Sequence, residues 1–320
     1  MIRYAIIGAG WRSEFYLRIA ALLPDIFKVS GIYVRNKEKQ HLVSAKYKVR
    51  VWDTLEGLLK GDFDFVVSCV NKAGINDMIK ALTEKGVPVL SETPVTDGTL
   101  TGKVQVAEQF HYMPRNQAYK RIIDSGILGE VHQVQLSCCH GCHAASLIRF
   151  FLNTGFEIPE TTSVSLIDKV TRYNGRNGLL PFSSVIEAKE EIKILKFKDK
   201  SAICDFSSEQ YFSDIRASRI VIRGECGEIV NNRCSYLNHG IPHSYAITRN
   251  AFGHDESLDG MSLCSITGEG MVLYTNPFPG ARLSDEELAI ATCLYKMKEY
   301  LETGKEFYSV QAAAFDTRLM

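Results

Sequence analysis

The chain has 320 residues, 45% of them hydrophobic and 23% charged, which is a globular composition sufficient for one large domain or two ordinary ones. Its 37 basic residues balance 37 acidic ones, and this zero net charge gives no sign of the excess positive charge that binds nucleic acids or anionic membrane surfaces. We expect neither a membrane-spanning helix, which needs an apolar run of roughly 20 residues, nor a secretory signal at the N-terminus.

The first hundred residues alternate between strand and helix patterns. Residues 2–7 are an apolar run that ends at Gly8, which predicts a buried strand entering a tight turn. Further strands are predicted at 27–34, 50–52, 63–70 and 87–90, and helices at 12–23, 36–46, 54–59 and 75–85. This alternation predicts an α/β domain with a doubly wound parallel sheet and helices on both faces.

After residue 95 the alternation gives way to strands. A loop at 95–102 precedes a sixth strand at 103–110, and helices are predicted at 114–125 and 144–152. Strand-like segments lie at 131–137, 186–197, 201–206, 218–224, 227–230 and 270–274. This part of the chain therefore predicts a sheet that is mostly antiparallel, open, and covered on one face.

The last predicted helix, at 284–304, has clear signals at both ends. Ser284 and Glu287 form a capping box at its start, and Gly304 ends it. We divide the chain into an α/β domain at 1–110 and a C-terminal α+β domain at 111–320.

The turn after the first strand carries the pattern of a phosphate site. Gly8 permits the tight turn, and Gly10 lets a pyrophosphate approach the backbone N–H groups at the start of the helix, with Ala9, Trp11 and Arg12 beside it. The third glycine of the usual fingerprint is a serine, Ser13. Because the motif lies between a predicted strand and a predicted helix, it indicates a bound dinucleotide rather than an ordinary turn.

The end of the second strand bears on the type of dinucleotide. NAD sites usually place Asp or Glu there for the ribose hydroxyl, whereas NADP sites place Arg there for the 2′-phosphate. This chain has Arg35 and Asn36, and its first acid is Glu38. The sequence therefore favours NADP over NAD, although Arg35 could also be an ordinary exposed side chain.

At this point the chain resembles the glucose–fructose oxidoreductase, inositol dehydrogenase and rhizopine-catabolism (Gfo/Idh/MocA) family. The matching stretches lie at 5–18, 63–95, 106–114, 122–136, 141–152 and 284–304. The resemblance implies a Rossmann dinucleotide-binding domain at 1–110. It also implies that the domain at 111–320, with an open and mostly antiparallel sheet, serves the substrate and oligomerisation. It also implies NAD(P)-dependent chemistry on a small sugar, polyol or related molecule, and a homodimer or homotetramer. It assigns Val70, Asn71 and Glu92 to the cofactor site.

The chain departs from the family at the first catalytic motif. The family's Glu-Lys-Pro reads Glu92-Thr93-Pro94, so a threonine stands where a lysine normally assists hydride transfer. Threonine can donate a hydrogen bond but supplies no cation and does not titrate near neutral pH. The family's long helix after this motif is replaced by the short loop 95–102, which is expected to thin the cover over one sheet face near the site.

The second family motif, Asp-x-x-x-His, reads Cys139-His140-Gly141-Cys142-His143. The histidine is kept, and the resemblance makes His143 the best candidate for the general acid/base. The run "CCHGCH" could hold zinc, but no second cysteine pair lies at ligand spacing, so we expect no metal and interpret these residues as the lining of a pocket. With no export signal, the nine cysteines predict reduced thiols and a cytoplasmic protein.

Other side chains are weaker candidates. Tyr112, at the predicted domain junction, could relay a proton if its pKa were lowered, and Lys72 could replace the missing ammonium. His239 and His243 are interpreted as exposed loop histidines, because Gly240 and Pro242 argue against a helix between them. The surrounding loop-like segment 231–282 could still wall a substrate pocket.

Two functions remain open. The first is an oxidoreductase with altered acid/base groups, in which Thr93, His143 and Tyr112 manage the proton; reduction of an imine or of a thioester-derived ring is a minor variant. The second is a sensor or accessory protein that binds NAD(P) without catalysis, which the loss of the lysine favours. Retention of Glu92, Pro94 and His143 favours the first.

Overall fold

The computed structural model describes residues 1–254, 256–258 and 260–320. The chain folds into two compact units. The first comprises Met1–Gln117, Arg249–Ser265 and Thr275–Arg318, and the second comprises Ala118–Thr248, Ile266–Tyr274 and Leu319–Met320. A domain boundary at residue 110 stays a prediction.

Six parallel strands form the sheet of the first unit, in the order β3-β2-β1-β4-β5-β6. Their bounds are β1 (Ile2–Ile7), β2 (Phe27–Tyr33), β3 (Val51–Trp52), β4 (Phe65–Ser68), β5 (Val89–Ser91) and β6 (Val104–Val106). The order reverses at β1, which pairs with β2 on one side and β4 on the other. The predicted doubly wound α/β sheet is confirmed, although its sixth strand is shorter than predicted.

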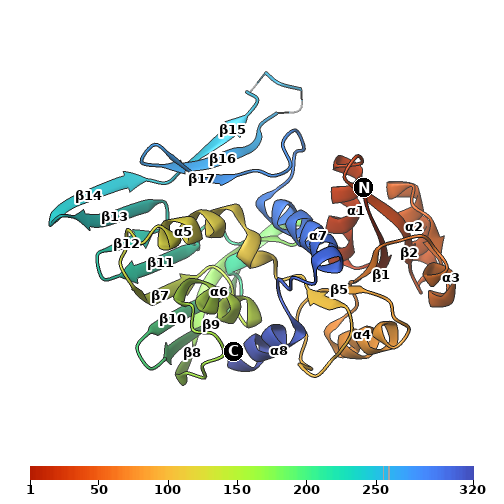
Figure 1. The fold of residues 1–320 in the computed structure, drawn as a ribbon, viewed down its shortest axis with the longest axis horizontal. Helices are drawn as coiled ribbons and strands as arrows, with labels where there is room; N and C mark the ends of the chain where they lie inside the picture. Colours follow the sequence, from red (N-terminus) through yellow and green to blue (C-terminus); the bar gives the residue numbers. More distant parts are fainter. Residues whose placement is uncertain (255, 259) are drawn as a thin grey trace. The chain divides into compact units, whose positions relative to one another are not determined.

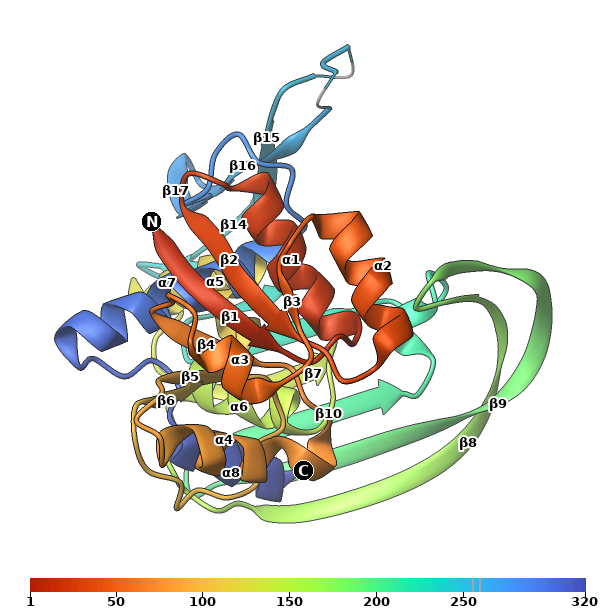
Figure 2. The same cartoon turned by 90° about the vertical axis from the view of Figure 1, so that its right-hand side faces the viewer.

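Helices cover both faces of this sheet, as Figure 1 and Figure 2 show. They are α1 (Trp11–Leu22), α2 (Lys37–Tyr47), α3 (Leu55–Leu59), α4 (Ile75–Thr83), α7 (Asp285–Thr303) and α8 (Val310–Leu319), with the short 3-10 helices η1 (Lys72–Gly74) and η2 (Gln109–Tyr112). Helix α1 packs against α7 and β2, whereas α3, α4 and α8 share a hydrophobic core with the opposite face. The predicted capping box of α7 is confirmed.

Helix α8 has no counterpart among the predicted elements. Its small residues Ala312 and Ala313 lie in the same core as Val95 and Val104. The hydroxyl of Thr317 donates a hydrogen bond to the carbonyl of Val95 at 3.1 Å. The expectation that the short 95–102 loop leaves a sheet face thinly covered is therefore wrong, because a helix from far along the sequence packs there.

The second unit contains an eight-stranded sheet in the order β14-β13-β12-β11-β7-β10-β9-β8. Its strands are β7 (Val131–Ser137), β8 (Glu160–Gly175), β9 (Gly178–Lys196), β10 (Ser201–Ser207), β11 (Arg219–Gly224), β12 (Gly227–Val230), β13 (Arg233–Asn238) and β14 (Ile241–Ala246). Every pairing is antiparallel except that of β10 with β7. The predicted open, mostly antiparallel sheet is confirmed.

Helix α6 (Cys142–Leu152) packs on β7 and buries its apolar face there. Helix α5 (Pro114–Asp124) begins in the first unit and continues into the second, and η3 (Gln210–Phe212) is a short 3-10 turn. Within the described ranges, no helix combines the length and the apolar composition needed to cross a membrane.

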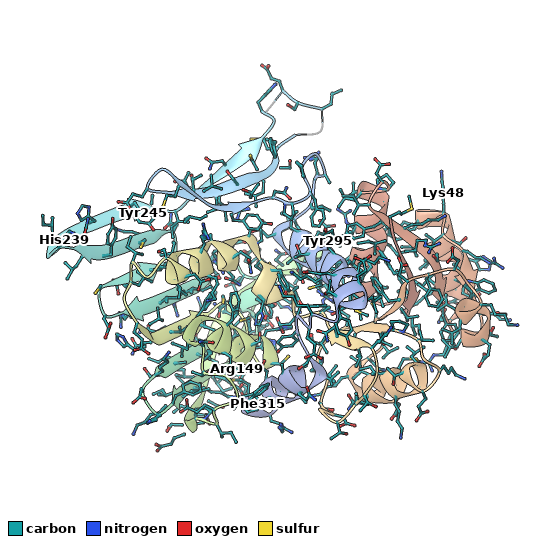
Figure 3. The ribbon with its side chains drawn as sticks, viewed as in Figure 1. Lys48, Arg149, His239, Tyr245, Tyr295 and Phe315 are labelled. Atoms are coloured by element: carbon teal, nitrogen blue, oxygen red, sulfur yellow. The ribbon has the colours of Figure 1, made fainter. Side chains whose placement is uncertain are left out.

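Residues 231–282 are largely strands rather than loops. Beyond β13 and β14 they form a three-stranded sheet of β15 (Thr248–Phe252), β16 (Ser262–Gly268) and β17 (Met271–Thr275). His239 lies at the tip of the β13–β14 hairpin (Figure 3), where its φ is +50°. The loop prediction is wrong for His243, which pairs within β14 and stacks on Tyr236 with ring centroids 5.3 Å apart.

Strands β8 and β9 form a long curved hairpin, drawn in green in Figure 2. Pairing runs from Glu160 opposite Lys196 to Gly175 opposite Gly178. Strand β8 is an edge of the sheet, and the hairpin exposes apolar side chains, among them Phe182, which is 87% exposed. A long exposed edge with apolar side chains is a surface that proteins normally cover.

Candidate functional site

The turn after β1 can be built only with glycine at its first position. Gly8 has φ +103°, and a Cβ there would lie 2.7 Å from the carbonyl oxygen of Cys69, the residue that follows β4. The backbone of Gly8 also donates a hydrogen bond to the carbonyl of Tyr33 at 3.1 Å. The glycine therefore allows the chain to leave β1 in close contact with the neighbouring strand.

Gly10 differs from Gly8, because neither its backbone conformation nor its neighbours require a glycine. It is the N-cap of α1, its φ of −91° is open to other residues, and no side chain caps the helix. A Cβ at Gly10 would meet nothing within 4 Å, so the space beside this residue, at the start of α1, is open. An uncapped helix N-terminus facing open space fits a phosphate group.

Ser13 takes the place of the third glycine without filling that space. Its side chain is buried, and its hydroxyl donates a hydrogen bond to the carbonyl of Gly10 at 2.6 Å. The hydroxyl points back at the turn, so the incomplete fingerprint still produces the turn and helix start that a dinucleotide requires.

The cofactor candidates come together at one edge of the sheet. Gly8 follows β1, Val70 and Asn71 follow β4, and Glu92 follows β5, and these three parallel strands are neighbours in the sheet. The carboxyl ends of parallel strands lie at one edge, where ligands of doubly wound sheets bind. Asn71 is exposed, and its side chain accepts a hydrogen bond from the N–H of Gly74 at 3.2 Å as the cap of η1.

Glu92 is engaged in a buried network with Arg12. The Nε of Arg12 donates to one carboxylate oxygen at 2.9 Å and its second nitrogen to the other at 3.1 Å, which is a bidentate pair. The hydroxyl of Tyr16 donates to the same carboxylate, and Glu92 is only 3% exposed. The carboxylate is therefore satisfied by side chains of its own unit, and it fixes the guanidinium beside the start of α1.

A second carboxylate completes this network. Glu286, in the first turn of α7, accepts a hydrogen bond from Arg12 at 2.6 Å. Burial alone would lower the pKa of Arg12, but the carboxylates of Glu92 and Glu286 raise it above its ordinary value, so the cation is permanent. Tyr16 could have been recognised from its spacing four residues after Arg12, whereas nothing in the sequence points to Glu286.

The end of β2 carries positive rather than negative side chains. Arg35 is exposed, and it forms no hydrogen bond or ion pair with the part of the chain that the structure describes. Asn36 caps α2, because its side chain accepts a hydrogen bond from the N–H of Lys39 at 3.0 Å. Asn36 thereby fixes the start of the helix that follows Arg35.

The first unit holds three further candidates, Thr93, Lys72 and Tyr112. Thr93 is half-buried and joined to Pro94 by a cis peptide bond, while Lys72 is exposed on η1. Tyr112 ends η2 and packs edge-on against Phe307, with ring centroids 6.3 Å apart. Burial raises the pKa of Tyr112 above its ordinary value, which is the opposite of the lowered pKa that a proton relay was expected to need.

In the second unit, His143 lies in the first turn of α6. It is half-buried, and its carbonyl accepts a hydrogen bond from the hydroxyl of Ser146 at 3.0 Å. The helix begins after Gly141, whose φ is +57°, and no side chain caps it. Of the run at 138–143, Cys139, His140 and Gly141 line a cavity of about 380 Å³. The interpretation of the whole run as pocket lining stays a prediction.

Residues 2–112 match a family described as oxidoreductases with an NAD-binding Rossmann fold. No curated protein matches the sequence. Among solved structures, an oxidoreductase from Agrobacterium radiobacter in complex with NAD⁺, L-tartaric acid and magnesium superposes with a TM-score of 0.67 at 16% identity, covering 99% of this chain and 94% of that one. A myo-inositol dehydrogenase from Corynebacterium glutamicum superposes with a TM-score of 0.63 at 15% identity, covering 100% and 94%.

A third structure extends the range of chemistry on this fold. It is biliverdin reductase from Synechocystis in complex with biliverdin and NADP⁺, with a TM-score of 0.62 at 12% identity, covering 99% of this chain and 96% of that one. At identities this low, the superpositions show that the fold is shared. The match to the Gfo/Idh/MocA family of oxidoreductases, described as having an NAD-binding Rossmann fold, is limited to residues 2–112.

Proposed function

We propose that the protein is an NAD(P)-dependent oxidoreductase that transfers a hydride to or from a small polar substrate, such as a sugar, a polyol or a related carbonyl or imine. The observation that carries this proposal is the Gly8–Gly10 turn with the uncapped N-terminus of α1 behind it. The inositol dehydrogenase of the same fold supports a polar substrate. A bound nicotinamide dinucleotide would supply or accept the hydride.

In this proposal the residues of the turn bind and orient the dinucleotide. The backbone N–H groups after Gly10 hold the pyrophosphate, and the carboxylates of Glu92 and Glu286 fix the guanidinium of Arg12 beside them. Val70 and Asn71 line the nicotinamide end. Glu92 acts through Arg12 and is a positioning residue, because its carboxylate is already bonded to two side chains.

In the proposed reaction, side chains other than a lysine exchange a proton with the substrate or donate a hydrogen bond to it. His143 is proposed as the acid/base that exchanges a proton with the substrate oxygen, because an imidazole titrates near neutral pH. Thr93 donates a hydrogen bond to that oxygen. With its raised pKa, Tyr112 keeps its proton and can act only as a neutral hydrogen-bond donor.

The direct test has two parts. Binding of NADPH and NADH is measured by quenching of protein fluorescence, and turnover is measured at 340 nm against a panel of sugars, polyols, ketones and imines. We expect cofactor binding with turnover of at least one class, and His143→Ala is expected to lower kcat about 100-fold or more, the usual contribution of a general acid/base. Absence of NADPH and NADH binding would contradict the proposal.

The non-catalytic alternative, a sensor or accessory protein, rests on the threonine at position 93. If the protein binds NADPH but turns over no member of the panel, and Thr93→Lys restores no activity, the sensor function is the better explanation. If Thr93→Lys instead raises a measurable activity, the fold and the remaining groups support catalysis and position 93 limits its rate.

NADP is the proposed preferred cofactor, with NAD as the alternative. Replacing Arg35 with alanine is expected to weaken NADPH binding about 10- to 100-fold and leave NADH nearly unchanged, because only NADPH presents a 2′-phosphate to the guanidinium. Lys37→Ala, at the neighbouring start of α2, is the matched control. Tighter binding of NADH than of NADPH by the unaltered protein would contradict the preference.

We also propose a homodimer or homotetramer that uses the β8–β9 hairpin. Leu179 and Phe182 are 81% and 87% exposed on it, and a second copy of the chain would bury them. The double variant Leu179→Glu/Phe182→Glu is expected to lower the mass measured by light scattering to that of a smaller assembly, whereas Leu42→Glu on α2 should not. A monomeric unaltered protein would refute this.

The cytoplasm is the proposed location. All nine cysteines lie in described segments, and the structure contains no disulfide between them. Thiols kept in this state are typical of a reducing compartment.

A further inference from the structure

The tip of the β8–β9 hairpin carries two Asn-Gly pairs. Residues 174–178 read Asn-Gly-Arg-Asn-Gly, and they join the end of β8 to the start of β9. Asparagine is a thermolabile residue, because its side-chain amide can react with the backbone nitrogen of the residue that follows it. A following glycine leaves that nitrogen accessible, because glycine has no Cβ. Which of the two pairs is poised for this reaction depends on the local geometry.

The side-chain amide of Asn174 lies directly against the backbone nitrogen of Gly175. The N–H of Gly175 donates a hydrogen bond to Oδ1 of Asn174 at 2.9 Å. The carbonyl carbon of that amide, Cγ, is bonded to Oδ1 and belongs to the same short contact. Groups that react with one another in proteins start from separations of this order, about 3–3.5 Å.

The backbone around this contact is irregular and open to water. The register of the hairpin shifts between Arg172 and Asn174. Before the shift, the hydroxyl of Tyr173 donates a hydrogen bond to the carboxylate of Asp214 at 2.6 Å, which ties β8 to the rest of the unit. After it, Asn174 is half-buried and residues 176–178 are exposed. Water therefore reaches the segment in which the Asn174 amide contacts the nitrogen of Gly175.

We propose that Asn174 is a site of spontaneous deamidation. The backbone nitrogen of Gly175 attacks Cγ of Asn174, so that a new N–C bond forms and the bond from Cγ to the side-chain nitrogen breaks. That nitrogen leaves as ammonia with the proton of the Gly175 N–H, and a succinimide ring remains. One water then opens the ring to aspartate or to isoaspartate. Water is the only co-reactant, and the reaction does not depend on the oxidoreductase function.

Deamidation would place a negative charge on the surface proposed for assembly. Asn174 pairs directly opposite Leu179 in the hairpin, and directly opposed residues share one face of a sheet. A second copy that buries Leu179 would also bury the new carboxylate, which is unfavourable without a partner. The deamidated protein is therefore expected to form a smaller assembly. This consequence rests on the proposed homodimer or homotetramer, whereas the deamidation itself does not.

The experiment follows the mass of tryptic peptides while the full chain is incubated in mildly alkaline buffer. Trypsin cleaves after Arg172 and Arg176, so the peptide 173–176 contains Asn174 and the peptide 177–189 contains Asn177 as its one asparagine. We expect 173–176 to gain the mass that exchanges an amide for a carboxylic acid, and to split into aspartyl and isoaspartyl forms on chromatography. A digest of freshly purified protein gives the background.

Two asparagines of the same protein serve as internal controls. Asn238 is exposed at the tip of the β13–β14 hairpin, but His239 follows it instead of a glycine. Asn174 is expected to convert at least about 10-fold faster than Asn238 and faster than Asn177. In urea, Asn174 and Asn177 should convert at similar rates, because both are then unfolded Asn-Gly pairs. Absence of the mass gain in 173–176, or equal rates for Asn174 and Asn238 in the folded protein, would overturn the proposal.

Gly175→Ala tests the attacking nitrogen. A Cβ at Gly175 would lie 3.8 Å from Cδ2 of Leu180, which is an ordinary contact, so the variant should fold like the unaltered protein. Its methyl group hinders the approach of the nitrogen to Cγ, and we expect conversion of Asn174 to slow at least about 10-fold. An unchanged rate would exclude the attack by this nitrogen.

Asn174→Asp separates the deamidation from its consequence for assembly. The variant carries one of the two products from the start and should give a smaller mass by light scattering, whereas Asn238→Asp, with the same added charge on another hairpin, should not. If Asn174 converts but Asn174→Asp assembles like the unaltered protein, the deamidation stands and its effect on assembly is refuted. A monomeric unaltered protein would refute the proposed assembly, and the mass gain in 173–176 would still decide the deamidation.

Discussion

Replacing Gly10 with aspartate is expected to abolish dinucleotide binding while leaving the fold intact. The backbone of Gly10 suits any residue, and a Cβ there enters open space, so the variant should fold. Aspartate is also a favourable N-cap and should hold or slightly raise the melting temperature. Its carboxylate would occupy the pyrophosphate position with a like charge, which costs several kcal/mol and lowers NADPH affinity by about 100-fold or more.

Gly8→Ala provides the contrast. At Gly8 the φ of +103° and the contact with the Cys69 carbonyl make any side chain strained. This variant is expected to lose about 1–3 kcal/mol of unfolding free energy from backbone strain, measured by urea denaturation. If Gly10→Asp loses stability to the same degree, or if it binds NADPH normally, the two glycines do not have the separate roles assigned to them.

Replacing Arg12 with methionine is expected to destabilise the protein by about 3–5 kcal/mol. The variant leaves the carboxylate of Glu92, which is 3% exposed, with Tyr16 but without its cation. A buried charge deprived of its partner is far more costly than the pair itself. Urea denaturation measures the loss, and the double variant Arg12→Met/Glu92→Gln should recover a large part of it.

The matched control is an exposed pair of the same unit. Lys46 pairs with Glu14 at 2.6 Å, and both side chains are about half exposed, at 60% and 47%. Lys46→Met should change the unfolding free energy by about 1 kcal/mol at most, because water screens such pairs. Equal losses for Arg12→Met and Lys46→Met would show that the Glu92 network is not a buried ionic centre.

The strands and helices of the Rossmann unit can be predicted from local sequence patterns. Each strand of a parallel sheet is a short buried apolar run, and two of the helices between strands carry side-chain caps, Asn36 for α2 and Thr54 for α3. The capping box at Ser284 marks α7 in the same way. These signals involve residues a few positions apart, so a linear reading recovers them.

The elements that escaped prediction depend on distant partners. Strand β8 has exposed residues along most of its length and lacks a clean alternation, so only its pairing with β9 identifies it. Strands β13 and β14 contain Asn, His and Pro, which favour turns in isolation. Helix α8 owes its place to Val95 and Val104, more than 200 residues earlier in the chain.

The proposed dinucleotide site could be predicted from the sequence because its glycines are required by the conformation and the surroundings of the backbone. Few residues suit a turn with a φ of +103° or a helix start that needs open space. Gly8 and Gly10 therefore indicate these two features in the sequence. Only the tertiary structure decided what the side chains do. It joined Arg12, Glu92, Tyr16 and Glu286 across three strand and helix ends, and it placed Lys193 opposite Cys204 in a cavity. Electrostatic interactions and burial depend on distances in the folded structure, and the spacing of residues along the chain does not show which distant groups become neighbours.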